Sequence, residues 1–190
     1  MSRRTRDPAA KQAALVAAAA EAFTTHGFAA ASTGRIADDA GVSEGIVFHH
    51  FGSKHGLLQA TTRMETTAFM ASMGELDEDG AIDWERALDR TFDWVAGHAM
   101  VSRLWSENDD RVIGSLRRGL QEAVVARFTV LLEREQEAGR CRSGDARWFA
   151  ELQFAVVGEA LITHFSDPDR LPRDVAIAEA ARVVRAIVSP

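Results

Sequence analysis

Apolar residues recur along most of the chain at spacings of three and four, which is the period of an α-helix. No stretch alternates steadily between apolar and polar positions, as a half-buried strand would. The prolines stand at positions 8, 168, 172 and 190, and none falls between residues 9 and 167. Proline breaks helix interiors, so its absence permits long helices. The pattern predicts an all-α fold.

The first quarter of the chain predicts three helices, followed by the start of a fourth. Helical spacing and boundary residues place them at about 8–26, 32–40 and 44–51, with the fourth beginning after Ser53. Glycines at positions 27, 41 and 52 follow the first three, where a helix commonly ends. Two of the predicted helices are therefore very short and closely spaced.

The rest of the chain predicts longer helices. Their ranges are about 84–99, 116–139, 145–165 and 174–188, and a polar break at 106–110 separates the first two, with room for a short helix after it. The helix at 145–165 is apolar on nearly all sides, so it must be covered by more than one neighbour. The last helix carries two adjacent apolar stripes.

Residues 32–54 contain the pattern that best indicates a function. Two short helices are joined by a tight turn around Gly41, which is the spacing of a helix-turn-helix. Val42, Val47 and Phe51 share one side of the second helix and are expected to face the core. The opposite side then holds Glu44, Gly45, Ile46, Phe48 and His49. By itself, the same pattern also fits a purely structural pair of helices.

Contact with DNA would explain the residues on that opposite side. Exposed Ile46 and Phe48 suit contact with thymine methyl groups and the sugar–phosphate edge. Ser32, Ser43 and Lys54 stand at helix starts, where hydroxyls and backbone N–H groups can bind phosphates. These residues are therefore candidates for a nucleic-acid interface.

The same region resembles the N-terminal DNA-binding domain of the TetR family of bacterial repressors. The matching pieces are AAEAFTTHGF at 19–28, STGRIADDAGVS at 32–43 and EGIVFHHFGSKHGLL at 44–58. The resemblance implies a homodimer that binds a palindromic operator through paired recognition helices. It also implies release by a small molecule bound in the helical body, and a dimer interface made by the last two helices.

With that resemblance, we expect a three-helix DNA-binding head at 1–52 and a helical ligand-binding and dimerisation body at 53–190. The candidate DNA-binding residues are Arg3, Arg4, Ser32, Thr33, Arg35, Ser43, Glu44, Gly45, Ile46, Phe48, His49 and Lys54. The candidate residues for the dimer interface are Trp148, Leu152, Val156, Ala180, Val184 and Ile187. The alternative for the last two helices is that they only close the core of one chain.

The sequence departs from the family pattern on the recognition helix. Phe48 stands where a tyrosine is usual, and Glu44 stands where a lysine or arginine is common. Glu44 is either a reader of a cytosine amine or a solvated surface residue. Arg35 can supply positive charge that is missing there. The basic arm that includes Arg3 and Arg4 either reaches along a minor groove or is a disordered tail.

Charge is distributed unevenly, which makes a net charge of −6 compatible with DNA binding. Residues 1–60 hold six basic and five acidic residues, a net charge of +1. Residues 61–190 hold sixteen basic and twenty-three acidic residues, a net charge of −7. Phosphate binding depends on the local potential more than on the total charge.

An effector site is expected among aromatic and flexible side chains of the body. The candidates are Phe69, Met73, Phe92, Trp94, Trp105 and Phe128, with Met70 and Trp84 beside them and with His98 or His164 as a polar anchor. Such stripes are usually plain core. Together they favour a small apolar effector over a sugar or a phosphate.

Other chemistry finds little support in the sequence. The histidines show no metal-ligand spacing, no nucleophile or phosphate-binding motif is present, and no convergent catalytic set can be placed, so we expect neither an enzyme nor a bound cofactor or metal. Cys141, the one cysteine, suits a reducing cytoplasm; between Arg140 and Arg142 it is either a redox-sensitive thiol of lowered pKa or incidental. No apolar run is long enough to span a membrane, and no signal peptide is evident.

The alternative function is a helical module that binds a ligand or a protein and whose head no longer recognises DNA.

Overall fold

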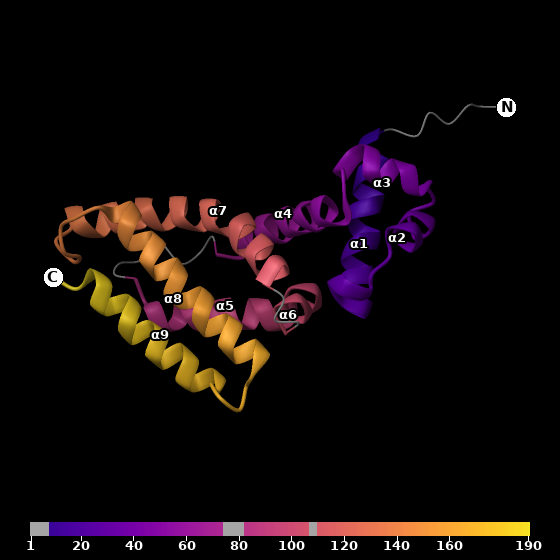
Figure 1. Ribbon diagram of the computed structural model, residues 1–190. Helices are drawn as coiled ribbons and strands as arrows, with labels where there is room; N and C mark the ends of the chain where they lie inside the picture. Colours follow the sequence, from indigo (N-terminus) through magenta and orange to yellow (C-terminus); the bar gives the residue numbers. More distant parts are fainter. Residues whose placement is uncertain (1–7, 74–81, 107–109) are drawn as a thin grey trace.

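The computed structural model describes residues 8–73, 82–106 and 110–190, with the side chains of a few residues at 105–117 left out. These residues form helices and no strand, which confirms the all-α prediction. The helices are α1 (Pro8–Ala30), α2 (Thr33–Asp39), α3 (Glu44–Phe51), α4 (Lys54–Ser72), α5 (Trp84–Gly97), α6 (Ala99–Ser106), α7 (Asp110–Glu137), α8 (Ala146–Ser166) and α9 (Arg173–Val188). Figure 1 shows α1, α2 and α3 gathered at one end and α9 at the other. No helix in the described ranges combines the length and apolarity of a membrane span.

The head is a helix-turn-helix built on α1. Helix α1 is interrupted at Gly27, whose φ of 75° is a conformation that other residues rarely adopt. Between α2 and α3 the turn is tight, because the Val42 N–H donates to the Ala37 carbonyl at 2.9 Å. Ile36 and Val47, one from each short helix, are fully buried against α1 and α4. The two short helices are therefore held in place by their packing against α1 and α4.

Helix α6 was missed by the sequence pattern, which ran one helix through 84–99 and placed the break at 106–110. The chain instead leaves the helix at His98, with φ −106° and ψ 89°, directly after Gly97. The His98 ring stays tied to the end of α5, because its Nδ1 lies 2.6 Å from the Trp94 carbonyl oxygen. After this break, α6 turns to pack against α1.

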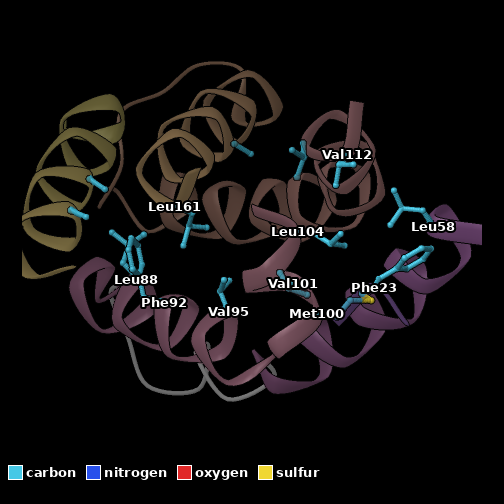
Figure 2. Close-up of a cluster of buried hydrophobic side chains, with 14 of the residues drawn as sticks. Phe23, Leu58, Leu88, Phe92, Val95, Met100, Val101, Leu104, Val112 and Leu161 are labelled. Carbon is cyan, nitrogen blue, oxygen red and sulfur yellow. The ribbon is translucent and has the colours of Figure 1, made fainter. Parts of the chain in front are cut away.

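The hydrophobic core runs without interruption from the head into the body. Phe23 of α1 and Leu58 of α4 belong to the same buried cluster as Leu104 of α6 and Phe92 of α5. Figure 2 shows this row, with Met100, Val101 and Leu104 of α6 between the two ends. Helix α6 therefore connects the packing of the DNA-binding head to that of the body.

Helices α4 and α7 cross at very close range. A Cβ placed on Gly119 of α7 would lie only 2.6 Å from Cγ2 of Thr62 on α4. The Thr66 hydroxyl of α4 also lies 3.3 Å from the Gly119 carbonyl oxygen. Glycine at this position lets the two backbones approach.

The predicted dimer residues divide into two groups. Ala180 and Val184 are only 4% and 1% exposed within the single chain, so their assignment to the dimer face was wrong. They cover α8 and α5 from inside, because α9 packs on both of these helices. Trp148 is 54% exposed, whereas Leu152, Val156 and Ile187 are half-buried. The first turn of α9 adds Val175, which is exposed.

We predict that Gly119→Ala lowers the free energy of unfolding by about 1–3 kcal/mol, because the added methyl overpacks the crossing of α4 and α7. Thr62 cannot turn away easily, since it is buried and its hydroxyl donates to the Leu58 carbonyl at 2.8 Å. Urea unfolding followed by circular dichroism measures the effect.

Gly158→Ala is the matched control, because it makes the same change inside helix α8 with nothing within 4 Å of the added Cβ. Its better helix propensity should leave the protein as stable as before or slightly more stable. Equal stability of the two variants would contradict the close crossing.

Candidate functional site

The outer face of α3 is organised by one buried residue. Val47 is fully buried, so the helix turns its opposite side to solvent. That side presents Glu44, Gly45 and His49, all exposed, and Phe48, whose side chain is 49% exposed. One exposed phenylalanine is common on protein surfaces, but on this face its ring is available for contact with a partner.

Ile46 lies at the edge of this face and not at its centre. It is half-buried and packs against the main core cluster, whereas the pattern placed it fully outside. Its side chain can therefore offer only part of its surface to a partner. Phe48 is the main apolar group that the face presents.

Glu44 does not simply extend into solvent. Its carboxylate accepts a 2.5 Å hydrogen bond from the Thr33 hydroxyl at the start of α2, and it lies 3.7 Å from the Cβ position of Gly34. A negative charge is favoured there, because the first N–H groups of a helix carry partial positive charge. Two of the predicted DNA-binding residues, Thr33 and Glu44, are thus paired with each other.

Lys54 has a structural role that the sequence did not reveal. Its Nζ donates to the carbonyl oxygens of Phe28, Ala29 and Ala31 at 2.7, 3.1 and 2.9 Å. It also lies 4.6 Å from the centroid of the Phe28 ring. An ammonium group has three N–H donors, and all of them are used here. The predicted role of Lys54 as a phosphate ligand would require at least one of these bonds to break.

Three of the remaining candidates on the head are accessible. Ser32, Ser43 and Arg35 are exposed, and neither serine hydroxyl caps its own helix. Arg3 and Arg4 lie outside the described residues. The roles predicted for these five residues remain predictions.

The body contains an apolar cavity. It is partly open to solvent. All six helices of the body, including α4, contribute to its wall. Aromatic residues dominate this wall: Phe69, Trp84, Trp94, Phe128 and Phe154. A hollow with a wall of this apolar and aromatic character is typical of a site for a small organic molecule.

Four of the eight predicted effector-binding residues line the cavity, namely Phe69, Met73, Trp94 and Phe128. Trp84, which the pattern placed beside them, also lines it. Of Trp105 only the backbone is described.

The other three predicted residues do not line the cavity. Phe92 is buried in the core against His164. The Nδ1 atom of His164 lies 3.0 Å from the Leu171 carbonyl oxygen. His98 stacks on Trp94 from outside, at 3.8 Å between ring centroids. None of the three lines the cavity, and each makes one of the contacts just described.

Sequence reasoning missed the polar residue of the cavity, Gln153. It lies on α8, lines the cavity and is 3% exposed. One signal was available: Gln153 is an uncharged polar residue within the helix that is otherwise apolar on nearly all sides. Gln153 is the one polar residue among the buried residues of α8.

Comparison with known proteins identifies the family. Residues 15–61 match the family model described as "Bacterial regulatory proteins, tetR family". The chain is also 30% identical over 134 residues to the HTH-type transcriptional repressor AcnR of Corynebacterium efficiens, covering 68% of this chain and 68% of that protein. The chain belongs to the TetR family. It is thus a helix-turn-helix, DNA-binding transcriptional regulator.

Two further similarities extend this result. The TetR-family chain is 43% identical over 101 residues to the HTH-type transcriptional regulator BetI of Ectopseudomonas mendocina, covering 50% of this chain but only 52% of BetI. The solved structure of the SmeT–triclosan complex, SmeT being the repressor of a Stenotrophomonas maltophilia multidrug efflux pump, matches with a TM-score of 0.66 at 20% identity. That match covers 95% of this chain and 92% of SmeT, and it shows a common fold.

Cys141 of this TetR-family protein is not an activated thiol. Burial raises its pKa, with a further contribution from the negative charge of Glu135, and these outweigh the opposing effect of Arg140. Arg140 is instead directed to the buried Glu135 carboxylate, through hydrogen bonds of 2.8 and 2.7 Å. The alternative of a thiol with a lowered pKa is therefore wrong, because the lowering effect of Arg140 is the smaller one.

We predict that Lys54→Met lowers the free energy of unfolding by about 1.5–3 kcal/mol in the absence of DNA, because it removes charge-assisted hydrogen bonds to three carbonyls. Lys11→Met makes the same chemical change on α1 and should alter stability by less than about 0.5 kcal/mol. Chemical unfolding of both variants measures the difference. Equal stability of the two would show that the contacts of Lys54 contribute nothing.

We also predict that Cys141 reacts with iodoacetamide more slowly than an unperturbed thiol near neutral pH. A raised pKa lowers the thiolate fraction at any given pH, and the thiolate is the nucleophile. The rate should rise as pH increases through and beyond the ordinary thiol range. Mass spectrometry of alkylation over time, with free cysteine as the control, tests this; faster reaction at Cys141 would contradict the raised pKa.

Proposed function

We propose that this chain is a homodimeric repressor that binds a palindromic operator through α3 and leaves it when a small apolar molecule enters the cavity. The observation that carries this proposal is that one helix, α4, belongs to both sites. It starts in the DNA-binding head and ends in the wall of the cavity. Figure 1 shows α4 leading from the head to the side of α7.

Both ends of α4 are held by hydrogen bonds. At its first residue, Lys54 binds the carbonyls at the end of α1. At its C-terminal end, Arg90 of α5 donates to the Ser72 carbonyl and Arg127 of α7 donates to the Met73 carbonyl, each at 3.1 Å. Arginines at a helix C-terminus also compensate its partial negative charge. Because both ends of α4 are bonded to their neighbours, a displacement of α4 at the cavity would also move its first turn, which contacts the head.

A ligand that enters the cavity would displace side chains of α4 in its wall. Phe69 and Met73 of α4 form a small buried cluster with Val124 beside the hollow, and the Phe69 ring contacts Trp94 at 5.0 Å between ring centroids. A ligand that spreads these side chains would favour a different placement of α4, and a ligand shifts an equilibrium only through such differential contacts. The neighbour SmeT, solved with triclosan, provides an example of a small organic ligand on this fold.

A dimer would complete the DNA-binding surface. Trp148 on α8 and Val175 on α9 are exposed apolar residues on the last two helices of the chain. Pairing of these helices with a second copy would bury them and would place two α3 helices on one DNA duplex. Successive major grooves on one face are about 34 Å apart, and two heads must match that spacing.

The test is DNA binding with Phe48 altered. Operator sequences are first selected from random duplexes with the unaltered protein. Phe48→Ala should then weaken binding to the selected operator by about tenfold, or ~1.4 kcal/mol, because it removes an apolar contact with the groove. Fluorescence anisotropy at several salt concentrations measures the affinity for the selected operator and for random DNA.

Val130→Ala is the control for that experiment, since Val130 is an exposed apolar residue on α7 in the body. It should bind as the unaltered protein does. If Phe48→Ala and Val130→Ala bind the selected operator equally well, α3 is not the reading helix.

One observation favours a second candidate function, a ligand- or protein-binding module without specific DNA recognition. The Glu44 carboxylate is held by Thr33 over the start of α2, where a phosphate would be repelled. Failure of the selection to enrich any sequence, with no salt-dependent complex even at low salt, would support this alternative.

A further inference from the structure

The cavity contains a buried hydrogen-bond acceptor without a partner. Gln153 is almost wholly buried, and its Nε2 donates to the Val184 carbonyl of α9 at 3.4 Å. Within the described part of the chain, its Oε1 has no hydrogen-bond partner and no contact with solvent. Leaving such a group unsatisfied is unfavourable, and buried polar atoms are nearly always bonded in folded proteins.

The orientation of the amide follows from its surroundings. A carbonyl oxygen accepts hydrogen bonds and cannot donate, so the end of the amide nearest Val184 must be the nitrogen. The oxygen is therefore the end left over, on a side chain that lines the cavity. One side chain of the cavity wall thus carries an acceptor that no described protein group satisfies.

The other residues of the wall limit which class of ligand can supply a hydrogen-bond donor to this oxygen. Among the described residues that line the cavity, no side chain is ionisable. Apart from the indole N–H groups of Trp84 and Trp94, the other polar group of the wall is the Thr91 hydroxyl, which already donates to the Ala87 carbonyl at 2.8 Å within α5. The remaining surface is aliphatic and aromatic, so a charged molecule would lose its hydration and gain no counter-charge.

We propose that the effector is an uncharged, largely apolar molecule with a hydroxyl or N–H group that donates a hydrogen bond to Gln153 Oε1. A carboxylate is disfavoured, because it would bring a second acceptor against the first in a wall without a cation. This inference rests on the proposed function in taking the cavity as the effector site, and it adds the chemical class of the ligand and the residue that selects it.

Three probes of similar size separate the possibilities: 2-naphthol donates a hydrogen bond, 2-methoxynaphthalene only accepts one, and 2-naphthoate is an anion. Binding to the full chain at neutral pH is measured by isothermal titration calorimetry and by quenching of tryptophan fluorescence, since Trp84 and Trp94 line the cavity. We expect 2-naphthol to bind at least about tenfold more tightly than either other probe. Equal binding of the three, or no binding of 2-naphthol, would overturn the proposal.

Gln153→Met removes the acceptor and keeps the size and shape of the side chain. The preference for 2-naphthol should fall below about threefold, while the affinity for 2-methoxynaphthalene stays the same or increases. Thr91→Val is the matched control, because it removes the hydroxyl of the wall and should leave the preference intact. If Gln153→Met does not fold, the comparison of the three probes on the unaltered protein still decides.

Thermal unfolding without ligand separates a binding role from a structural one. If Gln153 is kept for its ligand, Gln153→Met should melt at the same temperature as the unaltered protein or higher, because a buried unsatisfied acceptor is gone. A lower melting temperature with loss of all probe binding would mean that the amide mainly joins α8 to α9, and would overturn the proposal.

Release of the selected operator distinguishes this inference from the proposed function. If 2-naphthol binds with the expected preference but does not release DNA, the ligand class stands and release by an effector in the cavity fails. If all three probes bind equally and release DNA, the proposed function stands and the role of Gln153 fails.

Discussion

Three backbone carbonyls at the end of α1 converge on one ammonium group, that of Lys54, and this contact determines how α4 leaves the head. Helix α1 ends in a short turn after Gly27, which exposes carbonyls that lack partners within the helix. Lys54 satisfies them from the first turn of α4. The direction of α4, and with it the placement of the head on the body, depends on this junction.

The body combines a continuous core with a hollow. One buried cluster runs from the head through α6 to α9, while Phe69, Met73 and Val124 form a separate small cluster beside the cavity. An apolar hollow lowers stability, because its walls lose packing contacts. Part of the wall, including Leu88 and Leu161, belongs to the continuous core, whereas Phe69 and Met73 of α4 belong to the small cluster. The α4 side of the wall therefore depends least on the main core.

The sequence predicted what is set locally and missed what depends on neighbours distant in the chain. The helix-turn-helix followed from glycines, caps and apolar spacing within about two dozen residues, and all of these signals are local. The role of Lys54 depends on carbonyls more than twenty residues away, which no spacing rule describes. The two apolar stripes of α9 were visible, but which of them faces α8 was not, and so Val184 was placed outside. Helix α6 was missed because a break at Gly97 and His98 leaves the helical spacing almost unchanged.

The crossing of α4 and α7 has a consequence for how the two helices can move. Thr62 turns its methyl group toward Gly119, whereas the Thr66 hydroxyl lies 3.3 Å from the Gly119 carbonyl oxygen. Small side chains of this kind do not interlock as long ones do. A small shear between the two helices would therefore displace few side chains at this crossing, but it would change the contact between Thr66 and the Gly119 carbonyl.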